Sequence, residues 1–171
     1  MDKNGFWEII ENSRSVLSSN DPDGNLEQQA QAIKLALSEL SEEEVLSFAN
    51  IFHSLKEDLY TWELWGAAYV IGGGCSDDGF ADFRNWIISL GREAYELALS
   101  SPDDLGPVSS DSSVEDVFFE ELAYIPEEVF EEQFDKELDI AVPYSPDPKG
   151  KEWDEDTVDS LYPKLAKLYA E

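Results

Sequence analysis

The chain has 171 residues, 42% of them apolar, and its 39 acidic residues outnumber 11 lysines and arginines to give a formal net charge of −28. This apolar content suffices for a buried core, so the chain is not disordered throughout. Because so negative a surface repels phosphate groups, we expect neither direct nucleic-acid binding nor membrane binding. A lone cysteine, Cys75, excludes an internal disulfide. With no apolar signal region and no run near the roughly 20 residues of a spanning helix, we expect a cytoplasmic protein.

Helical spacing of apolar residues predicts the first two helices at residues 6–18 and 26–40, with a turn-rich loop between them. Val45, Phe48 and Phe52 step by three and four and predict a third helix, and Ser41 with Glu44 forms a capping-box pattern at its start. The stripe continues into a stretch that is apolar on nearly every side and ends at three glycines. We therefore expect one buried helix over residues 42–71.

The second half of the chain is predicted to contain a helix at 77–100, an exposed loop at 103–113 and a helix at 114–134 that Pro126 divides. Residues 135–153 are rich in proline and indicate an extended connection before a last helix at 155–170. The sequence thus predicts an all-α fold, a single compact domain of six or seven helices with 42–71 and 77–100 as the central pair. We expect residues 1–134 to form a helical core domain, and residues 135–171 to add the extended connection and a C-terminal helix packed on the same domain.

The most distinctive pattern lies in residues 62–91, which read WELWGAAYVIGGGCSDDGFADFRNWIISLG. Together with Phe6-Trp7, this segment strongly resembles the hallmark of a bacterial family known as domain of unknown function 4240. The resemblance covers about residues 1–130 and implies a helical fold and a bacterial source. It implies no activity, because none is assigned to the family.

Residues 72–79, here called the glycine turn, are the first candidate site. Glycines let a ligand approach the backbone, and the N–H groups that start the next helix can hold an anion. A tight turn between helices, capped by Asp77 and Asp78, is the simpler interpretation, and we favour it. Arg84 is either a ligand group for a carboxylate or phosphate, or a structural partner of the turn. The candidate pocket residues are Trp62, Trp65, Cys75, Ser76, Asp77, Asp78, Arg84 and Trp86.

The chain offers few groups for catalysis. A nucleophilic Cys75 would need a base, and the single histidine, His53, lies far away along the helical path. The acids of the glycine turn lack the alternate spacing of a calcium loop. We therefore name no catalytic residue, no metal and no cofactor, and lean against an enzyme without excluding one.

A run of acidic residues is the second candidate site. Between Asp103 and Asp139 there are 14 acidic residues and a single cation, Lys136. Such a run is usually a solvated face, but it is also suited to binding a basic protein. The candidate partner-binding residues are Glu120, Glu121, Glu127, Glu128, Glu131 and Glu132.

Three functions remain open from the sequence. The first is a non-enzymatic acidic helical protein that docks a basic partner protein, as an immunity protein or inhibitor does. The second is an enzyme or small-ligand sensor with its pocket at the glycine turn, and the third is a mimic of DNA charge. A pocket into which Arg84 and an acid point would favour the second, and an acidic face with Arg84 engaged in structure would favour the first.

Overall fold

The computed structural model describes residues 1–170 and consists of helices joined by short loops and one long extended segment. In that range the elements are α1 (Lys3–Ser13), η1 (Arg14–Val16), α2 (Asn25–Ser38), α3 (Glu42–Asp58), α4 (Trp62–Gly72), α5 (Asp77–Ser89), α6 (Arg92–Ser100), η2 (Pro102–Leu105), α7 (Gly106–Ser109), η3 (Glu120–Tyr124), α8 (Ile125–Phe134), α9 (Val158–Leu161) and α10 (Pro163–Tyr169). The α labels denote α-helices and the η labels 3-10 helices. The all-α prediction is confirmed, but ten α-helices replace the six or seven expected because several predicted helices are divided.

The predicted helix over residues 42–71 is two helices. The capping box is confirmed: the Ser41 side chain accepts from the backbone N–H of Glu44, and the Glu44 carboxylate accepts from that of Ser41. However, α3 ends at Asp58, and Thr61 takes an extended backbone with its hydroxyl accepting from the N–H of Leu64 across 3.1 Å. A threonine that caps a new helix competes effectively with continuation of the old one.

The other predicted helices also divide at residues with special backbone geometry. Gly91, with φ of +111°, separates α5 from α6. The prediction of one continuous helix over residues 77–100 is therefore wrong. Residues 114–119 are not helical, because the N–H of Phe119 donates to the carbonyl of Asp82 and its carbonyl accepts from Asn85. Pro126 lies in the first turn of α8, as predicted.

The predicted loop at 103–113 also contains short helices, since η2 and α7 lie within or across it. The last predicted helix divides into α9 and α10, and Pro163 begins α10.

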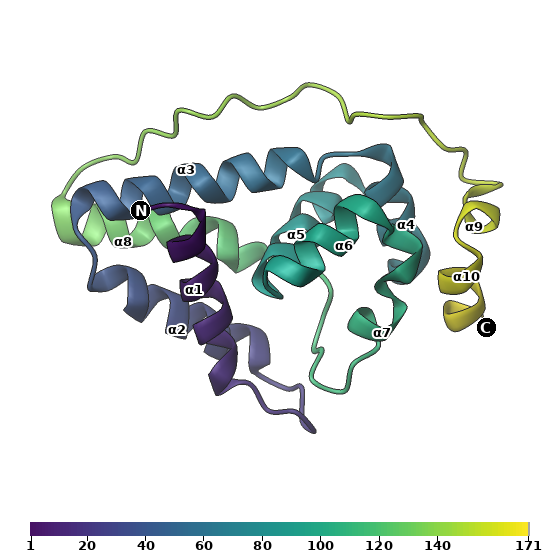
Figure 1. The fold of residues 1–171 in the computed structure, drawn as a ribbon, viewed down its shortest axis with the longest axis horizontal. Helices are drawn as coiled ribbons and strands as arrows, with labels where there is room; N and C mark the ends of the chain where they lie inside the picture. Colours follow the sequence, from purple (N-terminus) through teal and green to yellow (C-terminus); the bar gives the residue numbers. More distant parts are fainter. Residues whose placement is uncertain (171) are drawn as a thin grey trace.

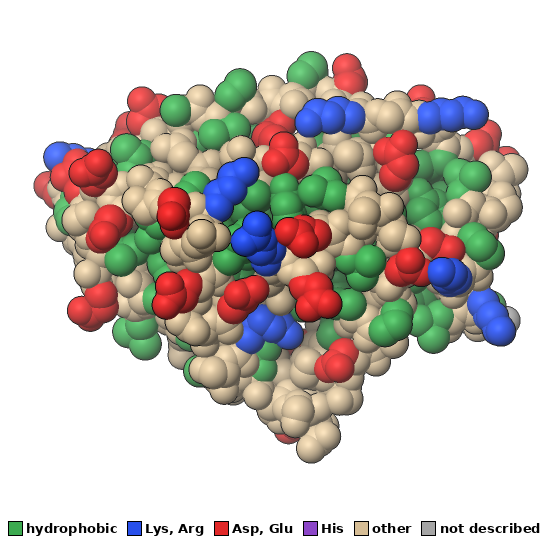
Figure 2. Space-filling view, in the orientation of Figure 1, with side chains coloured by type: hydrophobic (Ala, Val, Ile, Leu, Met, Phe, Trp, Pro, Cys, Tyr) green, Lys and Arg blue, Asp and Glu red, His purple; other side chains and the backbone are tan. Residues whose placement is uncertain are grey.

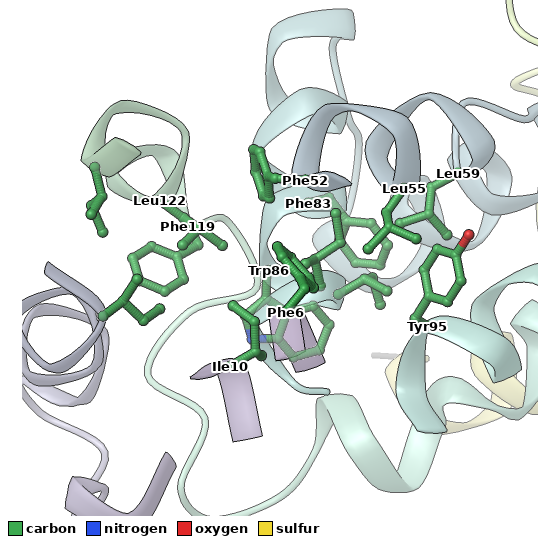
Figure 3. Packing of buried hydrophobic residues seen from close by; sticks show 14 of the residues in the cluster. Phe6, Ile10, Phe52, Leu55, Leu59, Phe83, Trp86, Tyr95, Phe119 and Leu122 are labelled. Carbon is green, nitrogen blue, oxygen red and sulfur yellow. The ribbon is translucent and has the colours of Figure 1, made fainter. Parts of the chain in front are cut away.

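The main core lies where α1, α2, α3, α5 and α8 meet. Figure 1 shows α3 along one edge with α8 beside it, and α8 packs against both α2 and α3. Most of the largest fully buried side chains come from these helices, among them Phe6, Phe48, Phe52 and Trp86. Figure 3 shows Phe6, Phe83 and Trp86 packed in this cluster.

The C-terminal segment crosses the molecule and docks at its other end. From the end of α8 it arches over α3 to α9 and α10, which lie against α4 (Figure 1). There it forms a second apolar cluster, made of Ala67, Val70, Val158, Tyr162 and Leu165. The two ends of the chain therefore depend on different apolar clusters.

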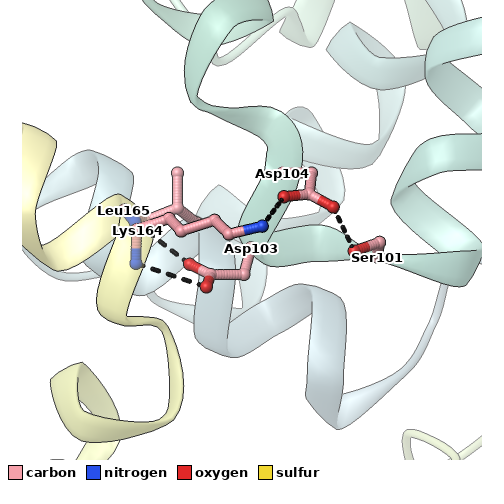
Figure 4. A network of polar contacts seen from close by, with 5 residues as sticks. All are labelled: Ser101, Asp103, Asp104, Lys164 and Leu165. Carbon is pink, nitrogen blue, oxygen red and sulfur yellow. Dashed lines mark hydrogen bonds and ion pairs between the residues drawn. The ribbon is translucent and has the colours of Figure 1, made fainter.

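A polar network fastens α10 to η2 (Figure 4). The Asp103 carboxylate accepts from the backbone N–H groups of Lys164 and Leu165, at 3.2 and 3.0 Å. Asp104 accepts from the Lys164 ammonium and from the Ser101 hydroxyl. Because the first N–H groups of a helix have no partner within it, Asp103 acts as a cap supplied from outside α10.

Candidate functional site

The glycine turn is a sharp connection between α4 and α5. Gly73 has φ of +67° and Gly74 of +126°, and both their N–H groups point back to the carbonyl of Tyr69 at the end of α4. Ser76 then begins α5 by accepting a hydrogen bond at Oγ from the N–H of Gly79, 3.1 Å away. The turn is therefore capped on both sides by its own residues.

Aromatic residues of the preceding segment hold this turn in place. The Trp65 indole N–H donates to the carbonyl oxygen of Cys75 across 2.9 Å, and the Tyr60 hydroxyl donates to Oδ1 of Asp77 across 3.1 Å. Asp77 and Asp78 are exposed in the first turn of α5, where negative charge is favourable beside the helix N-terminus. The chain's own carboxylates thus already supply negative charge at the helix start where an anion would bind.

Arg84 is buried, with 6% of its surface exposed. Its guanidinium lies 4.4 Å from the centre of the Tyr60 ring and 4.9 Å from that of Phe80. Nη1 donates to the carbonyl of Lys56 in the last turn of α3, 3.1 Å away, and Nε donates to the carbonyl of Phe80. Burial lowers the pKa of Arg84, and within residues 1–170 no carboxylate oxygen lies within 4 Å of its nitrogen atoms. These contacts assign Arg84 to the joint between α3 and α5.

Cys75 is partly buried within the turn, with Sγ 3.5 Å from the carbonyl oxygen of Ser76. Burial, together with the nearby carboxylates of Asp82 and Asp77, raises the pKa of the thiol to about 11. Because the thiolate is the nucleophilic form, this environment disfavours reactivity.

The candidate tryptophans divide into two groups. Trp62 and Trp65 stack with their ring centres 5.0 Å apart, and Trp65 stacks in turn on Phe80. Trp153 from the C-terminal segment packs edge-on against both indoles and donates from its own indole N–H to the carbonyl of Trp62. Trp86 instead faces the main core, because two residues along a helix turn it to nearly the opposite side of α5 from Arg84. The structure thus brings Trp62, Trp65, Cys75, Ser76, Asp77 and Arg84 together and leaves Trp86 elsewhere.

Three residues that the sequence analysis did not single out shape this region. Tyr60 and Phe80 form the aromatic surroundings of Arg84; the four-residue spacing to Arg84 was a signal for Phe80, and the sequence held none for Tyr60. Lys56 is partly buried, and burial together with the nearby Arg84 charge lowers its pKa to about 8. Nothing in the sequence around Lys56 distinguishes it from a solvated lysine.

The six candidate glutamates of the acidic run are all exposed and form what we call the acidic face, made of Glu120, Glu121, Glu127, Glu128, Glu131 and Glu132. The four on α8 point outward because Val129 and Phe130 turn the other side of this helix into the core, and Glu120 and Glu121 are exposed at the start of η3. Lys34 on α2 lies 3.6 Å from Glu128 and 3.3 Å from Glu132. Acidic residues are also scattered elsewhere, since Figure 2 shows them across the viewed surface among fewer lysines and arginines.

Fold and site together define a strongly acidic, all-helical protein whose hallmark segment serves as an aromatic and polar joint between helices. The family model of DUF4240, proteins of unknown function, matches residues 1–132, and the chain belongs to this family. Neither a curated protein nor a solved structure matches the chain. Across residues 1–170, no helix has the length and apolar character needed to cross a membrane.

Proposed function

We propose that this protein is a non-enzymatic binding protein that docks a basic partner protein through its acidic face, as an immunity protein or inhibitor does. The observation that carries the proposal is the exposure of all six glutamates on η3 and α8, of which Lys34 pairs with Glu128 and Glu132. Opposite charge accelerates the encounter of two proteins and favours the correct orientation.

The surroundings of Arg84 weigh against the rival function, a ligand pocket at the glycine turn. A ligand-binding arginine needs free donors directed into a recess, whereas Arg84 bonds backbone carbonyls and lies between aromatic rings. The raised pKa of Cys75 removes the obvious nucleophile. With Arg84 and Cys75 set aside, the negative surface charge is the feature on which we base the proposed function.

Affinity capture from the host lysate tests the proposal with three immobilised proteins. These are the wild type, an acidic-face variant (Glu127→Gln, Glu128→Gln, Glu131→Gln and Glu132→Gln) and a control variant that loses the same charge at other exposed sites (Glu39→Gln, Glu93→Gln, Glu152→Gln and Glu155→Gln). The proposal expects a basic protein that the wild type and the control retain and the acidic-face variant loses. A partner that all three retain equally, or an acidic one, contradicts it.

The third candidate, a mimic of DNA charge, predicts a more specific result. The captured protein would bind DNA, and added duplex DNA would release it in proportion to its concentration. A basic partner that DNA does not displace leaves the docking proposal standing and removes the mimic.

A further inference from the structure

A narrow groove lies on the acidic face between α2 and the segment formed by η3 and α8. Its volume is about 160 Å³, with Glu27 and Lys34 on the α2 side and Glu121, Tyr124 and Glu128 on the other. Ile125 lies at its base, 4% exposed, so the deepest part is apolar while the rim is charged.

The size of the groove decides what class of ligand it fits. Sites for small molecules and cofactors usually occupy about 300–1,000 Å³, whereas a cavity of about 150 Å³ holds a group the size of benzene. The groove therefore fits one side chain of a partner rather than a separate small ligand. Pockets that receive a single anchoring side chain are typical of the centres of protein interfaces.

The charge of the groove favours a positively charged group of another molecule. Three carboxylates and one ammonium group line it, and Lys34 is held by Glu128 and Glu132. Within residues 1–170, no lysine or arginine nitrogen lies within 4 Å of the carboxylates of Glu27 and Glu121. Those two groups are free to pair with a charge that another molecule brings.

Tyr124 favours arginine over lysine as the basic side chain that the groove receives. Its side chain is half exposed at the rim, a position that gives an incoming group an aromatic surface next to carboxylates. A guanidinium group stacks on aromatic rings and pairs with carboxylates in a planar geometry, and its hydrocarbon stem suits an apolar base such as Ile125. The ammonium group of lysine is compact and more strongly hydrated, so it gains less there.

We propose that the groove between α2 and η3–α8 receives one arginine side chain of the basic partner. The proposal rests on the proposed function and adds the residue type through which the partner is anchored. The guanidinium pairs with Glu121 and Glu27 and stacks on Tyr124, while the stem covers Ile125.

Peptide binding tests this assignment without the natural partner. We would titrate the full chain with hexa-arginine and hexa-lysine, which carry the same charge, and follow affinity and backbone amide shifts by NMR. We expect hexa-arginine to bind more tightly and to shift the amides of Ala30, Gln31 and Ile125. Tyr124→Ala should weaken hexa-arginine binding about two- to fivefold and remove the preference over hexa-lysine.

The matched control is Tyr144→Ala, because Tyr144 is exposed even more, at 73%, and contacts His53 rather than the groove. It should leave both affinities unchanged. If the peptides bind equally well and Tyr124→Ala has no effect, the groove assignment is wrong while the acidic-face proposal stands. If the wild type binds neither peptide, the groove assignment fails and the acidic-face proposal is weakened with it.

Discussion

Arg84 on α5 donates from Nη1 to the carbonyl oxygen of Lys56 across 3.1 Å, in the last turn of α3. The last carbonyls of a helix lack partners within it, and a cation there is also favoured by the helix dipole. A residue from the hallmark segment thereby caps a helix that precedes this segment in the chain. This contact explains how an arginine becomes buried in a protein with a large excess of acidic residues.

Replacing Arg84 should destabilise the fold. Arg84→Lys removes the planar donors and the stacking on Tyr60, so we expect a loss of about 1–3 kcal/mol in the free energy of unfolding. Arg92→Lys is the control, because Arg92 is exposed and its contacts with Glu96 and Asn4 lie at the surface, and it should change stability by less than about 0.5 kcal/mol. Urea unfolding measures both. Wild-type stability of Arg84→Lys would contradict a structural role.

Replacing Gly73 should lower the stability of the fold because of the backbone conformation at this position rather than because of neighbouring atoms. Its φ is +67°, while a Cβ built there would meet no atom within 4 Å. Gly73→Val should therefore cost about 1 kcal/mol or more, and Gly73→Asn clearly less, because asparagine adopts this conformation more readily. Thermal melts of the two variants make the comparison. Equal losses for Val and Asn would argue against a left-handed Gly73.

The contact between Gly66 and Tyr162 should control the docking of the C-terminal helices. A Cβ on Gly66 would lie 2.6 Å from Cε2 of Tyr162, so Gly66→Ala should push α9 and α10 away from α4. We expect faster proteolytic cleavage in residues 135–157, with the main core intact because its apolar cluster is separate.

Repeating Gly66→Ala in a protein that lacks the Tyr162 ring separates the clash with Tyr162 from any effect on α4 itself. In a Tyr162→Ala protein, Gly66→Ala should stabilise α4 by up to about 1 kcal/mol, because alanine favours a helix more than glycine does. The same sign in both backgrounds would show that Tyr162 does not limit the size of residue 66.

Lys56 should make stability depend on pH. Burial lowers its pKa from 10.5 to about 8, so the folded chain releases this proton before the unfolded chain does. The charged form is disfavoured by folding below about pH 8, and this penalty disappears as pH rises toward 10.5. Lys56→Met should therefore raise the melting temperature at pH 7, and its advantage over the wild type should shrink between pH 8 and 10.5. A difference independent of pH over this range would contradict the lowered pKa.

The sequence predicts those features of the fold that depend on local pattern. The apolar stripe of α3 and its capping box both follow from spacing and residue type. The helix breaks at Thr61 and Gly91 do not follow from this pattern, because apolar residues at helical spacing continue across both positions. The non-helical residues 114–119 depend on hydrogen bonds to α5, which a local pattern does not contain.

The candidate site shows the same division between local and tertiary information. The glycine turn was predictable from residue types, as was the outward position of the glutamates on α8, but the cap of α5 is Ser76 and the predicted capping residues Asp77 and Asp78 lie in the first turn. The role of Arg84 required Tyr60 and the end of α3 to be placed beside it. The groove at Tyr124 joins residues about 100 positions apart, so it is visible only in the folded chain.

The most direct test of the central claim is the association rate of the captured partner, measured against salt concentration for the wild type and the acidic-face variant. Charges at an interface act mainly on association, and salt screens them beyond about 8 Å at physiological ionic strength. We predict that the wild-type rate falls steeply with salt, that the acidic-face variant associates more slowly with a flatter salt dependence, and that the control variant behaves nearly as the wild type. Equal rates and equal salt dependence for the wild type and the acidic-face variant would contradict the proposal.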